Sequence, residues 1–286
     1  MTDFSYYIRT IFLVFSSKFF PQPSLESIYL SKANTTRTIF VLFLTVFRPS
    51  EKKQKPVDDV STGFFVAGAV RIELTTRGFG DLNINDSTLE LGENVFSYCE
   101  DLTAVAFDSS TVEIGTYAFY DSGDDATVTF SNCGLDIDDK AFQSCGITAL
   151  NISGSETVMG DNAFSYCEDL TDVIIGVGNT EIGTYSFYDC TSLENVSIAA
   201  DSEDDSLSLV IDDKAFQSCS VQNVVIGRGN VELGDNAFSY CENLVGVEIK
   251  GVLLDIRDYV FYECPAELVI SYNGGSYNKE SIEDVK

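Results

Sequence analysis

The chain of 286 residues contains no histidine. Without imidazole it lacks the usual general base, the usual activator of a nucleophile and a common metal ligand. It also has no glycine-rich phosphate loop and no C-x-x-C pair, the cysteine spacing typical of zinc sites. We therefore predict that the protein is not an enzyme and binds no cofactor or metal.

Cationic side chains are scarce and unevenly placed. Residues 1–60 carry a net charge of +3, whereas residues 61–286 carry nine Lys and Arg against 40 Asp and Glu, a net charge of −31. Nucleic-acid affinity depends on cations that neutralise phosphates, so we predict no nucleic-acid partner, and anionic membrane surfaces are disfavoured for the same reason. Basic protein patches, cations or simple solubility remain as explanations of the acidity.

No apolar run is long enough for a membrane-spanning helix, which needs about 20 residues. Two Phe-rich runs, residues 11–15 and 38–47, lie in a segment, residues 1–60, that lacks the repeat described below. Three interpretations of this extension stay open: an atypical signal or anchor, a poorly ordered or misassigned segment, or a structured cap. Membrane contact is expected through residues 1–60 if at all, and residues 61–77 are expected to cap the repeats.

The dominant feature that is present is a phenylalanine recurring at intervals of 23, 23, 22, 23, 29, 22 and 23 residues. The eight positions are Phe96, Phe119, Phe142, Phe164, Phe187, Phe216, Phe238 and Phe261. A fixed period of about 20–30 residues indicates a solenoid, whose coils bury their apolar faces against one another. The 29-residue interval equals one coil with six additional residues, which we place around residues 201–205.

Each coil also contains a V-x-I pattern, the alternation expected of a strand with one buried face. Counting along the chain predicts nine such strands, from about residue 78 to Leu268–Ile270. The local sequence around the phenylalanine is of three types, for example GDNAFSYCEDL, IGTYSFYDC and IDDKAFQSC. The three types follow one another in a fixed order, so the sequence repeats in blocks of about 68 residues. Tandem duplication of a three-coil block explains the cycle; a ligand with matching spacing is the alternative.

The recurring string G-x-x-A-F-x-x-C-x-x-L-x-x-V-x-I resembles the BspA-like class of leucine-rich repeats over roughly residues 78 to 270. The resemblance implies a leucine-rich-repeat solenoid of the α/β class, dominated by β structure. It implies a right-handed superhelix with about nine short parallel strands and irregular or short helical turns opposite. It also implies a non-catalytic protein, often secreted or at a cell surface, that binds other proteins. Ser122, Asp125 and Pro265 depart from the pattern.

Seven of the eight cysteines occupy one position of the coil, three residues after the phenylalanine. This repetition favours a column of buried free thiols, since free Cys is among the most buried residue types. Disulfides between adjacent coils are the alternative. Cys133 lies outside the column and is predicted to be the most accessible thiol.

Adjacent aspartates recur in the loops of several coils rather than in one place. The pairs are Asp124-Asp125, Asp138-Asp139, Asp204-Asp205 and Asp212-Asp213. This recurrence favours solvated turns and caps over acid–base catalysis, which needs two carboxyl groups in one pocket. The loop at residues 201–205 is a weak candidate for Ca²⁺, because it lacks the spacing of a known calcium loop.

The predicted binding surface is the outward face of the strands, where two neighbouring columns of residues alternate with the buried ones. The candidate protein-binding residues are Asn151, Ile174, Ser197 and Val225 in one column and Asp172, Asn195 and Asn223 in the other. They carry little charge, as interface cores do. The alternative is the ordinary preference of outward strand positions for β-branched residues. Ile174 and Val225 are the expected anchors.

The sequence therefore predicts an adhesion-type protein that recognises another macromolecule, a protein ligand, through its strand face, outside the cell or at its surface. An intracellular interaction scaffold that uses the same face is the alternative. The predicted organisation is a non-repeat extension (1–60), an amino-terminal cap (61–77), the solenoid (78–272) and a carboxy-terminal tail (273–286).

Overall fold

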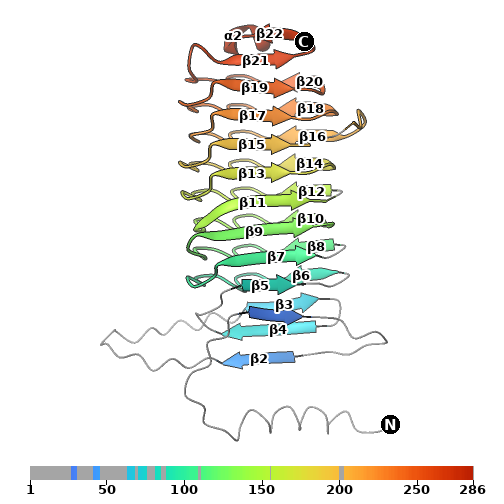
Figure 1. Ribbon diagram of the computed structural model, residues 1–286, viewed down its shortest axis with the longest axis vertical. Helices are drawn as coiled ribbons and strands as arrows, with labels where there is room; N and C mark the ends of the chain where they lie inside the picture. The colour runs from blue at the N-terminus through green and yellow to red at the C-terminus, as the bar shows by residue number, and fades with distance from the viewer. Residues whose placement is uncertain are drawn as a thin grey trace, which may run out of the picture.

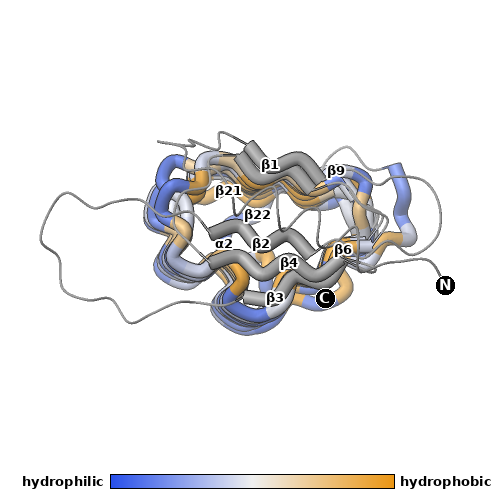
Figure 2. Tube along the Cα trace, turned by 90° about the horizontal axis from the view of Figure 1, so that it is seen from below, coloured by the Kyte–Doolittle hydropathy of each residue, from blue (hydrophilic) through white to orange (hydrophobic). Residues whose placement is uncertain are grey.

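The computed structural model describes residues 27–30, 41–45, 63–67, 70–75, 81–84, 88–108, 111–154, 156–199 and 203–285, with side chains from residue 88 onward. From residue 88 onward the chain forms a long stack of coils, each with two short strands (Figure 1). Seen along the stack, successive coils lie over one another (Figure 2). Of residues 1–60, the structure describes only 27–30 and 41–45. The interpretation of this segment as a signal or anchor therefore falls outside the described residues.

One parallel sheet, sheet A, runs the length of the stack. The nine predicted strands all occur in it, in chain order and without a break. They are β5 (Asp81–Ile84), β7 (Ala104–Asp108), β9 (Ala126–Ser131), β11 (Ile147–Ser153), β13 (Asp172–Ile175), β15 (Asn195–Ile198), β17 (Asn223–Ile226), β19 (Gly246–Ile249) and β21 (Val269–Tyr272). Strand β1 (Ser27–Leu30) pairs with β5, and β22 (Gly275–Tyr277) pairs antiparallel with β21. The predicted leucine-rich-repeat solenoid is confirmed.

A second sheet, sheet B, accompanies the first, where the sequence predicted only irregular or short helical turns. Its parallel strands are β6 (Leu89–Leu91), β8 (Thr111–Ile114), β10 (Gly134–Ile137), β12 (Glu156–Met159), β14 (Asn179–Ile182), β16 (Ser208–Ile211), β18 (Asn230–Leu233) and β20 (Val252–Ile256). In most of them buried and outward residues alternate, which allows each strand to cover the core with one face. The only helix in the described part of the chain is α2 (Lys279–Ile282).

Three strands lie before the first full coil and extend sheet B. Strands β3 (Gly63–Ala67) and β4 (Val70–Thr75) pair antiparallel, β2 (Val41–Thr45) pairs with β4, and β3 pairs antiparallel with β6. Two of these strands fall within residues 61–77. That this segment acts as the cap of the solenoid stays a proposal.

The turn from sheet B to sheet A holds the recurring phenylalanine and forms a third hydrogen-bonded ladder. In the coil of Phe164, the backbone N–H groups of Asn162, Phe164 and Tyr166 donate to carbonyls of the next coil at 3.0, 2.7 and 2.8 Å. The residues two before and two after each phenylalanine have positive φ, between 51° and 63°. Because of these left-handed residues, every second backbone N–H of the turn points along the stack axis and donates to the next coil. The turns are therefore hydrogen-bonded between coils as regularly as the strands are.

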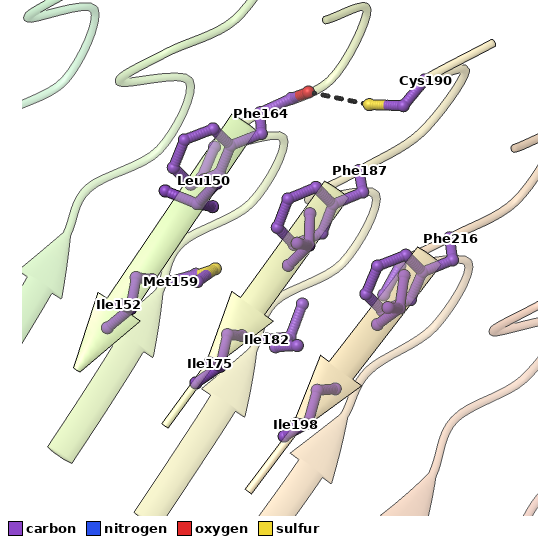
Figure 3. Close-up of a cluster of buried hydrophobic side chains, with 14 of the residues drawn as sticks. Leu150, Ile152, Met159, Phe164, Ile175, Ile182, Phe187, Cys190, Ile198 and Phe216 are labelled. Atoms are coloured by element: carbon purple, nitrogen blue, oxygen red, sulfur yellow. Dashed lines mark hydrogen bonds between the residues drawn. The ribbon is translucent and has the colours of Figure 1, made fainter. Parts of the chain in front are cut away.

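The phenylalanines stack on one another through the core. All eight are buried, and neighbouring ring centroids lie 4.7 to 5.8 Å apart with interplanar angles of at most 15°. Phe164, Phe187 and Phe216 lie in one row above the aliphatic side chains of both sheets (Figure 3). A second pair, Phe107 and Phe130, stacks at 4.8 Å beside this row. The Phe period is therefore the period of the core.

Seven cysteines lie beside the phenylalanine row, and these seven and Cys133 are all free and buried. The thiol of Cys190 donates to the carbonyl of Phe164 in the preceding coil at 3.3 Å (Figure 3), and Cys167 does the same to Phe142 at 3.1 Å. Ser122, which replaces cysteine in the second coil, donates through its hydroxyl to the carbonyl of Phe96. The position therefore needs a small donor, which explains why serine is accepted there.

Two sequence expectations about single residues are wrong. Cys133 is not accessible: it is fully buried at the corner between β9 and β10, and burial raises the pKa of its thiol to about 11. The register of the last strand is shifted by two residues, since Ile270 and Tyr272 pair with Val247 and Ile249. The predicted buried pair was Leu268 and Ile270. Ile270 lies nine residues after Phe261, as Val247 lies nine after Phe238, so the strand keeps the spacing of the other coils. The apolar Leu268 misled the prediction.

The six additional residues lie between β15 and β16, as the sequence predicts. Strand β14 still pairs with β16, and β15 pairs with β17, so the insertion leaves both sheets in register. In the described part of this loop, Asp204 accepts hydrogen bonds from the backbone and hydroxyl of Ser206. Asp205 lies 3.3 Å from the guanidinium of Arg228 in the next coil.

Candidate interaction surfaces

The seven predicted binding residues lie together on the outward face of sheet A. Asn151, Ile174, Ser197 and Val225 pair in sequence across β11, β13, β15 and β17 and form one column. Asp172, Asn195 and Asn223 form the neighbouring column in the same strands. The structure thus brings all seven residues into one continuous patch, which we call the sheet A patch.

The sheet A patch is open and mostly uncharged, with polar side chains around two aliphatic ones. Ile174 is 48% exposed, Val225 is half-buried, and the three asparagines are exposed. The carboxylate of Asp172 accepts hydrogen bonds from Asn195, at 3.0 Å, and from the hydroxyl of Thr171, at 2.7 Å. The one charge among the seven residues is therefore already hydrogen-bonded within the patch.

The outward face of sheet B has the opposite character. Its central column carries carboxylates at six of eight positions in register. The column reads Glu90, Glu113, Asp136, Val158, Glu181, Val210, Glu232 and Asp255. Like charges directly opposite one another in neighbouring strands are destabilising. Sequence reasoning missed this column, although every member directly precedes the apolar residue five before the phenylalanine.

The carboxylates are densest at the amino-terminal end of sheet B. A cleft of about 250 Å³ there is lined by Glu90, Glu93, Glu113, Asp136 and Asp138. Burial and repulsion from Asp136 and Asp139 raise the pKa of Asp138. Among the residues that the structure describes, no group of His, Cys, Asp and Glu side chains has the arrangement of a metal site.

Two of the paired aspartates accept hydrogen bonds from the backbone of the next coil. The carboxylates of Asp139 and Asp213 accept hydrogen bonds at 2.8 Å from the backbone N–H of Asp161 and Asp235 in the next coil. This role fits the predicted turns and caps. In the described residues the four pairs lie along the stack rather than in one pocket, and Asp204-Asp205 and Asp212-Asp213 lie on either side of β16.

A feature that sequence reasoning missed is a set of three tyrosine clusters on the turns. They consist of Tyr98, Tyr117 and Tyr120; of Tyr166, Tyr185 and Tyr188; and of Tyr240, Tyr259 and Tyr262. In each cluster the third ring meets the other two edge to face, with centroids 5.3 to 5.7 Å apart. We call them the first, second and third tyrosine clusters. The three-coil cycle of the sequence is the signal that predicts them.

The clusters lie three coils apart because they repeat with the sequence block. Adjacent strands of a sheet are spaced by about 4.8 Å, so three coils separate neighbouring clusters by about 14 Å along the stack. The chain therefore presents aromatic rings at regular intervals on one edge of an acidic body.

The two sheets and the one buried phenylalanine per coil are the features of a solenoid repeat protein. A family model for the BspA-type leucine-rich repeat region matches residues 79–204 and 209–281, in six copies. The chain belongs to this family. No curated protein and no solved structure matches it. No helix in the described residues is both long and apolar enough to span a membrane.

Proposed function

We propose that the protein is a non-catalytic adhesion or interaction protein that binds a protein ligand through the sheet A patch, outside the cell or at its surface. The observation that carries this proposal is the contrast between the two sheets. The patch has one carboxylate among seven residues, whereas the outward column of sheet B has six among eight. Interface cores are depleted of charge, so the sheet A patch is the better docking face.

Two further features support the same face. The patch is built on strands that are hydrogen-bonded on both sides, so its side chains are held at fixed spacing and need little ordering on binding. Ile174 offers an exposed apolar side chain near the centre of the patch, where binding energy is usually concentrated. An intracellular scaffold that uses this face is the alternative, and the mature amino terminus in the native host discriminates between the two.

The test is a double substitution, Ile174→Asp with Val225→Asp, measured by surface plasmon resonance against a panel of purified extracellular-matrix proteins. We expect a matrix protein that binds the wild type to lose at least about tenfold in affinity, because two charges enter the centre of the interface. The thermal unfolding midpoint should be nearly unchanged, because both side chains point outward.

The matched control is Val158→Asp with Val210→Asp on sheet B. These two valines hold the corresponding outward positions and are half-buried, as Val225 is. The control should keep full binding. Equal binding by wild type and the sheet A variant would show that the face is wrong, and failure of the wild type to bind any matrix protein would count against adhesion.

A further inference from the structure

In the first two tyrosine clusters, a lysine of the next coil lies over a ring. The Nζ atom of Lys140 is 5.5 Å from the ring centroid of Tyr117, and that of Lys214 is 4.9 Å from Tyr185. Lys214 also donates a hydrogen bond of 2.8 Å to the hydroxyl of Tyr185. The chain therefore places a primary ammonium on these tyrosines twice through cation–π attraction, and in the second cluster a hydrogen bond is added.

In the described residues, which run to 285, the third cluster has no such lysine, because β22 and α2 follow the coil of Phe261 in place of a further coil. Counting 23 residues from Tyr259, as from Tyr117 to Lys140, leads to Ile282, which is buried in α2. The nearby Lys279 is occupied elsewhere, since it donates to the carbonyl of Cys264 at 2.6 Å. The rings remain open: Tyr240, Tyr259 and Tyr262 are 45%, 59% and 43% exposed.

The surroundings of the third cluster are acidic. A hydrogen bond to Glu263 and the repulsion of that carboxylate raise the pKa of Tyr262, which places Glu263 against the ring hydroxyl. Burial and the repulsion of Asp258 raise the pKa of Glu283, so both carboxylates lie near the foot of the cluster. A cation above these rings meets an aromatic face and carboxylates together, which strengthens its binding.

The backbone conformation of the cluster is costly for tyrosine. Tyr259 and Tyr240 have φ values of 62° and 59°, a region that asparagine tolerates better than aromatic residues do. Asparagine occupies the coil position of Tyr259, two residues before the phenylalanine, in Asn94, Asn162 and Asn236. The turn therefore does not require tyrosine at this position, and an aromatic residue there calls for another reason.

We propose that Tyr240, Tyr259 and Tyr262 form an open site for the primary ammonium group of a lysine side chain from a basic partner protein. The partner supplies the group that Lys140 and Lys214 supply in the other two clusters. The net charge of −28 attracts basic segments to this surface from a distance. A lysine fits better than a quaternary ammonium, because it can also donate to a tyrosine hydroxyl, as Lys214 does.

The test uses a tetralysine amide peptide as the probe, followed by nuclear magnetic resonance of ring-labelled tyrosine at about 150 mM salt, which screens distant charges. We expect the ring signals of the third cluster to shift on titration. In a Tyr259→Asn variant the dissociation constant should rise by about three- to fivefold. This variant keeps the backbone conformation, because asparagine holds the same place in three other coils.

Two controls make the test specific. The Tyr185→Asn variant should bind the probe as the wild type does, because Lys214 already occupies that ring. A peptide with Nε-acetylated lysines should give no shift. Equal affinity of wild type and Tyr259→Asn, or an equal response to the acetylated peptide, would overturn the proposal.

A gain-of-site variant tests it from the opposite side. Lys214→Asn removes the internal cation and leaves the rings of Tyr185 and Tyr188 in place. Their signals should then respond to tetralysine, as those of the third cluster do. A folded Lys214→Asn variant without such a response would contradict the proposal. The sheet A variant should keep its tetralysine response, which separates this site from the proposed protein-binding face.

Discussion

At the scale of single residues, the protein tolerates an unusual number of left-handed conformations without glycine. Two residues in every coil, one on each side of the phenylalanine, have positive φ. Such a conformation costs an ordinary residue about 1–2 kcal/mol. The hydrogen bonds between the turns of successive coils offset this cost. The left-handed residues orient every second backbone N–H of the turn toward a carbonyl of the next coil.

The buried phenylalanine row leads to the first prediction. Phe187→Ala should lower the free energy of unfolding by about 3–5 kcal/mol, since it removes a large side chain stacked between Phe164 and Phe216. Urea unfolding followed by circular dichroism measures the change. Ile174→Ala, on the outward face, should change it by less than about 0.5 kcal/mol. Equal effects of the two substitutions would mean that the row contributes nothing special to stability.

The second prediction concerns pH. Burial and the repulsion of Glu181 and Asp213 raise the pKa of Asp212 in the folded state above its unfolded value of about 3.8. The stability linked to this group is therefore complete below the unfolded pKa and is lost as pH rises through the folded pKa. Asp212→Asn should stabilise the protein at pH 7 by less than about 1 kcal/mol, because water screens the half-exposed carboxylate.

The same substitution should have no effect near pH 3, where the carboxyl is protonated in both states. Asp204→Asn is the opposite control, since hydrogen bonds from Ser206 lower the pKa of Asp204. Its stabilisation is present above the unfolded pKa and lost as pH falls, so this variant should be slightly destabilised at pH 7. Thermal melts of both variants between pH 3 and pH 7 measure the two signs. The same sign for both would contradict the assignment.

At the scale of elements, the corner between sheet A and sheet B sets how closely coils approach. A Cβ atom on Gly227, directly after β17, would lie 1.7 Å from the carbonyl oxygen of Ala199. The same atom on Gly176, directly after β13, would lie 3.1 Å from the carbonyl oxygen of Ile152. Equivalent positions in the repeat therefore differ in the space that they leave.

This difference gives the third prediction. Gly227→Ala should destabilise the protein by about 3 kcal/mol or more, because backbone must move, whereas Gly176→Ala should cost about 1 kcal/mol or less. Urea unfolding midpoints of the two variants and the wild type measure the two costs. Similar costs would show that the corner relaxes as a unit and that the short approach at Gly227 places no demand on the fold.

The elements differ in how well the sequence predicts them. Sheet A was predicted, with eight of nine strands in the correct register, because its V-x-I pattern is apolar in almost every coil. Sheet B was missed because Thr157 and Thr180 occupy buried positions that look polar in the sequence. Cys133 was misjudged since its burial depends on a corner, not on the repeat.

The candidate surfaces show the same division. The positions of the sheet A patch follow from the period-2 alternation, which fixes the direction of each side chain. The tyrosine clusters could not be assembled in this way, because their members come from two coils and meet only through the left-handed turns. Their repetition every three coils was visible, but the contact of Tyr98 with Tyr120 requires the geometry of the turn.

At the scale of the whole molecule, negative charge accumulates along sheet B. The carboxylates of Glu90, Glu113 and Asp136 face one another across adjacent strands, and few cations lie among them. Dissolved ions screen such repulsion. The molecule as a whole is therefore expected to depend on ionic strength for part of its stability.

The fourth prediction follows from this charge. The thermal unfolding midpoint should rise by several degrees when NaCl increases from about 10 mM to 500 mM, because repulsion within the native state is screened. Glu113→Gln should raise the midpoint at low salt and weaken its salt dependence. Differential scanning calorimetry measures both effects. A midpoint that falls with added NaCl would show that attractive ion pairs dominate instead.

The carboxy-terminal strand has a consequence for self-association. Parallel sheets that end in an open edge can add strands from other molecules, and a stack of similar coils offers a ready template for such growth. Here β22 turns back antiparallel on β21, is only three residues long, and is followed by α2. On sheet A, a second molecule that arrives with its coils in parallel therefore finds a short edge of the wrong direction. Among the described residues sheet B ends at β20 without such a hairpin, so end-to-end strand addition at this end is blocked on one sheet alone.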